Sequence, residues 1–144
     1  MKLLHAFGAG LAGAVVLTVT HQILKKLVAD APRMDLMGEE ALEKIADKTA
    51  TKLPKKNLYN VAMVADIAGN GLYYALAAIG KPKNATLRAS LMGLAAGIGG
   101  VLLPKHLRLT NAYSNRTLTT RLLTMAIYSL GGLVSGKIAS ALQK

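Results

Sequence analysis

The chain has 144 residues, and it combines a strong positive charge with a high apolar content. It contains 18 Lys and Arg against 7 Asp and Glu, a formal net charge of +11, and 52% of its residues are hydrophobic. A soluble domain of this length seldom combines such apolarity with only 4% aromatic residues, so we expect an integral membrane protein. The absence of cysteine excludes disulfides, cysteine-ligated zinc and a thiol nucleophile.

Four apolar stretches predict transmembrane helices at about 3–24, 58–80, 85–103 and 118–142. A helix needs about 20 apolar residues to cross a bilayer, a length that the first two stretches reach between charges. The last two reach it if the charged ends of Arg88, Arg121 and Lys137 extend to the interface. A soluble four-helix bundle is the alternative, but it would show a polar outer face that these segments lack. We therefore predict an all-α integral membrane protein, a four-transmembrane-helix bundle that forms a single membrane domain over 1–144.

The polar connector 25–57 predicts a short amphipathic helix between the first and second spans. Met37, Ala41 and Ile45 recur every four residues, while Glu40 and Lys44 form a favourable i,i+4 pair on the other side. Such a helix lies on the membrane surface or caps the bundle. It serves either as a solvated connector or as a docking surface for a protein partner.

The distribution of basic residues predicts the orientation. The loops after the first and third spans contain 12 Lys and Arg, whereas the other side contains 6. The positive-inside rule then places the connector in the cytoplasm and both termini outside. The expected partners of these charges are anionic lipid headgroups at the cytoplasmic face, and not nucleic acid, because the chain has no nucleic-acid motif or interleaved aromatic residues.

Small residues recur four positions apart within the predicted spans. This spacing puts both residues on one helix face, where two backbones can approach closely. It favours packing within one subunit, and a homo-oligomer is the alternative. The predicted helix-packing residues are Gly13, Gly93, Gly97, Gly132 and Gly136.

The two halves of the chain show a weak internal repeat. Gly10-Leu11-Ala12-Gly13 in the first span resembles Gly93-Leu94-Ala95-Ala96 in the third, and Tyr74-Ala75-Leu76 in the second resembles Tyr128-Ser129-Leu130 in the fourth. This pattern is that of a duplicated helical hairpin. Coincidence among abundant Gly, Ala and Leu is the alternative.

Polar residues inside the spans are the strongest candidates for a site. Tyr59, Met63, Asp66, Asn70 and Tyr73 step by four, three, four and three, so they form one stripe on the second span. Such a stripe is costly in lipid. We expect it to face the bundle interior, a partner or a water-filled cavity.

The depth of each residue along its helix predicts the neighbours of Asp66. Thr18 lies at the same level, His21 and Thr124 lie one turn closer to the connector, and Arg121 can reach down from further out. The predicted polar intramembrane site is Asp66, Asn70, Tyr73, Thr18, His21, Thr124 and Arg121. It is either a proton, cation or polar-solute site or a set of interhelical hydrogen bonds.

Catalytic and metal-binding patterns are missing from the sequence. It lacks an intramembrane carboxylate pair, a nucleophile elbow, a phosphate-binding loop and a histidine pair with metal-ligand spacing. We therefore predict no enzymatic activity, no cofactor and no metal. The expected function is that of an accessory or scaffold subunit, and the alternative is a small transporter or channel subunit that uses Asp66.

Three features together resemble small four-span bacterial inner-membrane proteins of unassigned function. They are the Gly-rich first span, the segment Ala31-Pro32-Arg33-Met34-Asp35 followed by Met37-Gly38, and the pattern Asp66-x-x-x-Asn70-x-x-Tyr73-Tyr74. The resemblance implies a location in the bacterial cytoplasmic membrane. It implies no catalytic or ligand-binding residue.

Overall fold

The structure is a computed structural model that describes residues 3–142, and its regular elements in this range are all helical. The long helices are α1 (Leu3–Leu27), α3 (Leu58–Ala78), α4 (Ala85–His106) and α6 (Leu118–Ala141). The shorter elements are α2 (Met34–Thr49), α5 (Ala112–Asn115) and the 3-10 turns η1 (Lys55–Asn57) and η2 (Pro82–Asn84). Four helices are long and apolar enough to cross a membrane, which confirms the predicted all-α architecture with four such segments.

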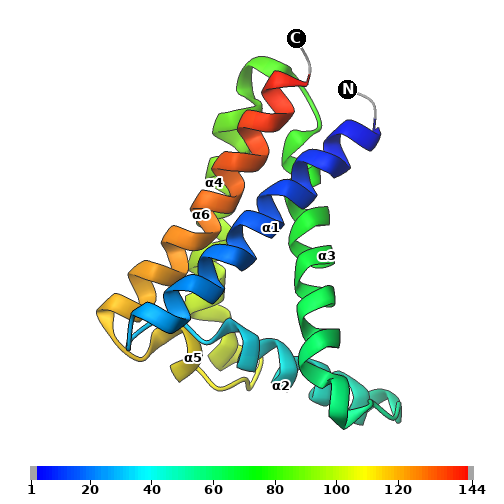
Figure 1. Cartoon of the computed structure of the whole chain (residues 1–144), viewed down its shortest axis with the longest axis vertical. Helices are drawn as coiled ribbons and strands as arrows, with labels where there is room; N and C mark the ends of the chain where they lie inside the picture. Colours follow the sequence, from blue (N-terminus) through cyan, green and yellow to red (C-terminus); the bar gives the residue numbers. More distant parts are fainter. Residues whose placement is uncertain (1–2, 143–144) are drawn as a thin grey trace.

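The long helices form a bundle that is open on one side (Figure 1). α4 and α6 make the most extensive helix pair, and α1 packs against both α6 and α3. α3 lies close to α1 near the chain termini and diverges from it toward the other end, where α2 lies across the gap. We call these the terminal end, which also holds the α3–α4 turn, and the connector end, which holds α2 and α5.

Glycine allows the helix backbones to touch. A Cβ added to Gly97 of α4 would lie 2.7 Å from the Cα of Met125 in α6, and one added to Gly132 would collide with the Ala89 carbonyl group. These approaches leave no room for a side chain. All five predicted helix-packing residues lie at such contacts between helices: Gly13, Gly93, Gly97, Gly132 and Gly136.

The core contains small residues at the terminal end and larger ones at mid-height. The first cluster consists of Ala6, Ala9, Ala78, Ala85 and Ala139, and the second includes Ala14, Leu17, Tyr74, Ile127 and Tyr128. Tyr74 is fully buried, and its hydroxyl donates a hydrogen bond of 2.7 Å to the Tyr128 carbonyl oxygen. This bond links α3 to α6 across the bundle.

Local hydrogen bonds fix two of the helix ends. Thr117 caps α6, because its hydroxyl accepts a bond of 3.1 Å from the Thr120 amide. Arg88 lies near the start of α4 and points toward the α3–α4 turn. It folds back to the C-terminus of α3, where Nε donates to the Ala77 carbonyl (3.1 Å) and Nη1 to the Lys81 carbonyl (3.0 Å). A cation is favourable there because unpaired carbonyl groups give that helix end a partial negative charge.

The predicted amphipathic helix is α2, and it packs into the base of the bundle. The predicted pair between Glu40 and Lys44 is confirmed, with 3.1 Å between charged atoms. Glu40 also accepts a hydrogen bond of 2.8 Å from the Thr110 amide, and Lys44 donates to the Arg108 carbonyl, so α2 is tied to the α4–α5 loop. Ile45 departs from the predicted apolar face: it is 59% exposed, because α2 turns the face with Met37 and Ala46 inward instead.

Candidate functional site

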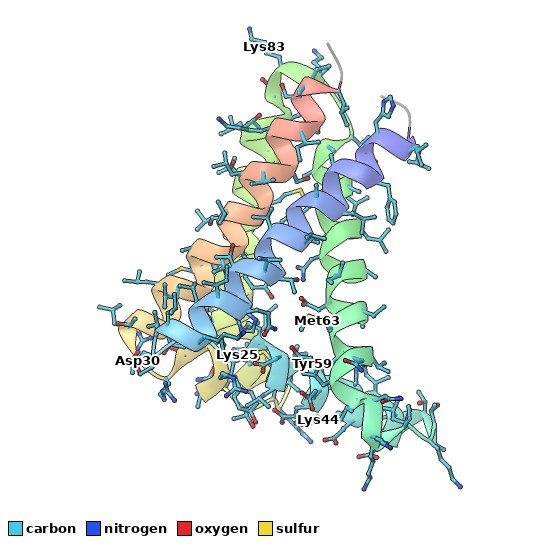
Figure 2. All side chains as sticks on the ribbon, in the orientation of Figure 1. Lys25, Asp30, Lys44, Tyr59, Met63 and Lys83 are labelled. Carbon is cyan, nitrogen blue, oxygen red and sulfur yellow. The ribbon has the colours of Figure 1, made fainter. Side chains whose placement is uncertain are left out.

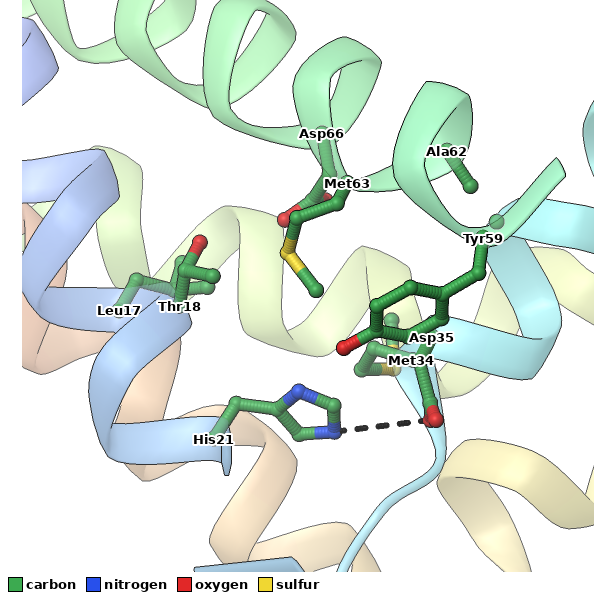
Figure 3. Close-up of a pocket in the computed structure, with 10 residues that line it drawn as sticks. Leu17, Thr18, His21, Met34, Asp35, Tyr59, Ala62, Met63 and Asp66 are labelled. Carbon is green, nitrogen blue, oxygen red and sulfur yellow. Dashed lines mark ion pairs between the residues drawn. The ribbon is translucent and has the colours of Figure 1, made fainter. Parts of the chain in front are cut away.

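A polar cavity lies where α3 diverges from α1 above α2 (Figure 3). Its empty volume is about 360 Å³, part of which is open to the outside, and about 20 Å³ is available to the centres of water molecules. The polar lining comes from three helices: Thr18 and His21 of α1, Asp35 of α2, and Tyr59 and Asp66 of α3.

Asp66 contributes a carboxyl group from within the predicted second span, 58–80. The Asn70 amide donates hydrogen bonds to Asp66 Oδ1 (2.9 Å) and to the Asp66 carbonyl oxygen (3.0 Å). The carboxyl group points into the cavity in Figure 3. Its hydrogen-bond partner thus comes from its own helix, one turn along α3.

Thr18 faces Asp66 from the opposite wall. The residue is only 8% exposed, and its Oγ1 lies beside the Asp66 carboxyl, with no hydrogen-bond partner within 3.5 Å among residues 3–142. Figure 3 shows this hydroxyl pointing into the cavity. The hydroxyl is thus placed to donate a hydrogen bond toward the Asp66 carboxyl across the cavity.

His21 is held in one tautomer by the α1–α2 turn. Its Nε2 lies 2.9 Å from the Pro32 carbonyl oxygen and 4.0 Å from Asp35 Oδ1. A carbonyl oxygen can only accept a hydrogen bond, so Nε2 carries the proton and Nδ1 of the neutral ring is an acceptor. Figure 3 shows that second nitrogen on the cavity side of the ring.

Asp35 is the centre of an ion cluster at the connector end of the cavity. It lies 3.0 Å from Lys25 Nζ and accepts two hydrogen bonds of 3.0 Å from Arg33. Burial by itself raises the pKa of the Asp35 carboxyl, but the hydrogen bonds from Arg33 and Lys25 outweigh it and lower the pKa to about 2. The same contact raises the pKa of the Arg33 guanidinium. Asp35 is therefore a permanent anion next to His21.

Three of the predicted site residues lie elsewhere. Tyr73 turns toward α4, where its hydroxyl donates a bond of 2.9 Å to the Met92 carbonyl oxygen. Thr124 is buried and donates to the Thr120 carbonyl oxygen of its own helix (2.8 Å), and Arg121 is exposed. Neither residue of α6 lines the cavity, since α6 packs against α1 and α4 more extensively than against α3.

The ion cluster that the connector contributes to the cavity was not predicted from the sequence. Asp35, Lys25 and Arg33 come together because the turn at Pro32 folds α2 back against the end of α1. An acidic residue in the first turn of a predicted helix was a usable signal, because that position favours a carboxylate. Its neighbours in space were not readable from spacing along the chain.

A second, apolar hollow lies between α4 and side chains of α2, α3 and α6, among them Met34, Tyr73 and Tyr128. It has an empty volume of about 820 Å³, and small residues of α4, among them Ala95, Ala96 and Gly99, form one wall. A Cβ added to Gly99 would meet only Leu103 of the same helix, 3.4 Å away. Beside the hollow, the side of α4 that carries Ala95 is exposed, in contrast to the face that meets α6.

The chemistry available at the polar cavity is proton exchange and the binding of water or a small polar species. Within residues 3–142, no group of three or more His, Asp and Glu is arranged to hold a metal ion. The bacterial cytoplasmic membrane that the sequence resemblance implies stays a prediction. No family model, curated protein or solved structure matches this chain.

Proposed function

We propose that this protein is a non-enzymatic integral membrane protein that acts as an accessory or scaffold subunit through helix packing. Four apolar helices support insertion in a bilayer. The charges support the predicted orientation, with the connector end in the cytoplasm of a bacterial cell and both termini outside. Figure 2 shows Lys25, Asp30 and Lys44 near the connector end and Lys83 at the opposite end.

The observation that carries the proposal is the uncovered small-residue face of α4. Ala95 and Gly99 are four residues apart, so they share one helix face, and Leu91 (57% exposed) and Leu102 (58% exposed) lie beside them. In lipid, helices associate by close backbone approach between small residues rather than by hydrophobic burial. Gly93 and Gly97 already serve this purpose against α6.

The proposed occupant of this face is α4 of a second copy. A contact between identical faces closes on itself as a dimer, and each α4 then covers the hollow of the other copy. α2 adds a charged surface at the connector end, where Glu43, Asp47 and Lys48 are exposed. That charged surface suits a soluble partner of the assembled subunit.

The oligomeric state of the full chain in mild detergent tests this assignment. We expect a dimer for the wild type and a monomer for Gly99→Leu, whose side chain would hold the two backbones apart. Gly69→Leu is the matched control, since a Cβ at Gly69 of α3 meets nothing within 4 Å. A Gly99→Leu variant that remains dimeric would contradict the proposed interface.

A second candidate function is supported by the polar cavity: a small transporter or channel subunit with a proton or cation site at Asp66. A carboxylic acid, a hydroxyl and an imidazole around one cavity are typical of proton relays in membrane proteins. Flux measurements in proteoliposomes test it. We expect Asp66→Asn to abolish a pH-dependent flux, and a flux that survives this substitution would exclude Asp66 as the site.

The packing also supports a duplicated hairpin. The repeat equates Gly10 with Gly93 and Ala75 with Ser129. A Cβ at Gly10 would lie 2.7 Å from the Ala75 amide nitrogen, and a Cβ at Gly93 would lie 3.1 Å from the Ser129 Cα. One contact of each glycine is thus equivalent in the α1–α3 and α4–α6 pairs, whereas their nearest neighbours, Gly71 and Tyr128, are not equivalent in the repeat.

A further inference from the structure

We propose that the cavity between α1, α2 and α3 holds water and lets Asp66 exchange protons with the connector end of the molecule only. The ligand class is water and the proton it carries. The proposal deepens the second candidate function, and it rests on that function only for the role of proton exchange in transport. The geometry behind it is independent of any partner.

The size of the cavity suits water. About 20 Å³ is open to water centres, and one water needs about 10–15 Å³ measured in this way. A buried water also needs two to four polar partners. The Thr18 hydroxyl, the Asp66 carboxyl and Nδ1 of His21 are three polar groups that can supply them. The same volume excludes a bulky solute.

His21 is the group with which Asp66 shares its proton. Through the water, the proton of an Asp66 carboxylic acid passes to His21 Nδ1, which leaves a carboxylate and an imidazolium ion, and the reverse step restores both neutral groups. No other bond changes. Asp35 lies 4.0 Å from His21 Nε2 and stays ionised, so it stabilises the imidazolium form.

The connector end of the cavity is open to the outside. Tyr59 lines it and is 41% exposed, so the lining continues to the molecular surface. Lys25 lies 5.6 Å from the centre of the Tyr59 ring, and the Arg33 side chain is 42% exposed. Protons therefore reach the cavity from the water around these charged groups.

The opposite end is closed by close packing. One turn beyond Asp66, Asn70 holds the carboxyl group, and the next residue, Gly71, lies against Leu11 of α1. A Cβ on Gly10 would collide with the Gly71 carbonyl oxygen. Tyr74 above this contact is fully buried, and its hydroxyl is already bonded to Tyr128. These contacts close the seam between α1 and α3 toward the terminal end.

Several titratable groups lie on the helices around Asp66. On α1 and α2 they are His21, Lys25 and Asp35. On α3 and α6 they are Tyr59, Tyr73, Tyr74 and Tyr128. Among the groups that line the cavity, His21 is the one whose ordinary pKa lies near neutral pH, so it is the expected proton partner.

Infrared spectroscopy of the full chain in proteoliposomes tests the proposal. The C=O stretch of a protonated Asp66 is identified by its loss in Asp66→Asn. We expect this band to titrate with pH, and His21→Gln to displace its midpoint by about one pH unit. Thr18→Val should shift the band, whereas Thr18→Ser, which retains the hydroxyl, should restore it. Thr124→Val is the control, because Thr124 is buried but lies outside the cavity.

Sidedness is tested by a pH jump outside vesicles sorted by orientation with a C-terminal affinity tag. The band should respond at once when the connector end faces outward, and should not respond when the terminal end does. A band that does not titrate, that ignores both His21→Gln and Thr18→Val, or that responds equally from both ends would overturn the proposal. If Asp66 titrates from the connector end alone but no flux is measured, the proposed proton access to Asp66 stands and the transport function is refuted.

Discussion

Replacing Gly97 with alanine should force α4 and α6 apart. The new Cβ would lie 2.7 Å from the Cα of Met125 and 3.1 Å from its carbonyl oxygen, whereas ordinary van der Waals contact begins at 3.4 Å. Both neighbouring atoms belong to the backbone, so no side chain can rotate away. Relief requires a shift of the whole of α6 by several tenths of an ångström, which also loosens the contacts at Gly93 and Gly132.

The free energy of unfolding of Gly97→Ala should fall by about 1–3 kcal/mol, the usual cost of overpacking a well-packed contact. Gly69→Ala is the control, since Gly69 is exposed on α3 and a Cβ there meets nothing within 4 Å. Both substitutions gain the same helix propensity, about 0.5–1 kcal/mol, so the difference between the variants isolates the steric cost. Unfolding by SDS in mixed micelles, followed by circular dichroism, measures it. Equal stability of the two variants would refute the packing argument.

Three further predictions follow from the connector end and from the α6 cap. The pKa of Asp35 is about 2 in the folded protein, against an ordinary 3.8, and this difference contributes about 2 kcal/mol to the free energy of unfolding above pH 4. Thermal stability should therefore fall as the pH drops from about 4 to about 2. Asp35→Asn should remove this dependence on pH. Thr117→Ala should cost about 1 kcal/mol in chemical unfolding, because the Thr120 amide loses its acceptor; no loss would show that water replaces the cap. In intact cells, an impermeant thiol reagent should label Lys83→Cys and not Lys52→Cys, and the opposite result would reverse the proposed orientation.

The sequence predicted the four long apolar helices because the thickness of a bilayer sets the length expected of an apolar helix. The bounds of α3 and α6 differ from prediction by only a few residues, whereas α4 continues to His106 because Pro104 does not end it. Glycine spacing also predicted the helix contacts, since small residues are what close backbones require. The carbonyl partners of Arg88 were not predicted, because they depend on how the α3–α4 turn folds back onto the end of α3.

The candidate site was only partly predictable because depth along a helix gives height and not direction. Thr18, at the level of Asp66, and His21, one turn closer to the connector, line the cavity with Asp66, whereas Thr124 shares the level of His21 but turns inward on α6. The helix that a side chain faces depends on which helices are neighbours in the bundle. Asp35 reaches the site through the fold of the connector, which no periodicity encodes.

Cysteine cross-linking at Ala95 tests the central claim most directly, because the chain has no native cysteine. Two Ala95→Cys side chains on paired α4 helices would come within the short Cβ separation that a disulfide needs. Oxidation in native membranes should then give a covalent dimer for Ala95→Cys. It should give none for Val64→Cys, which is 68% exposed on α3. A monomeric Ala95→Cys protein, or equal cross-linking at both positions, would contradict assembly through α4.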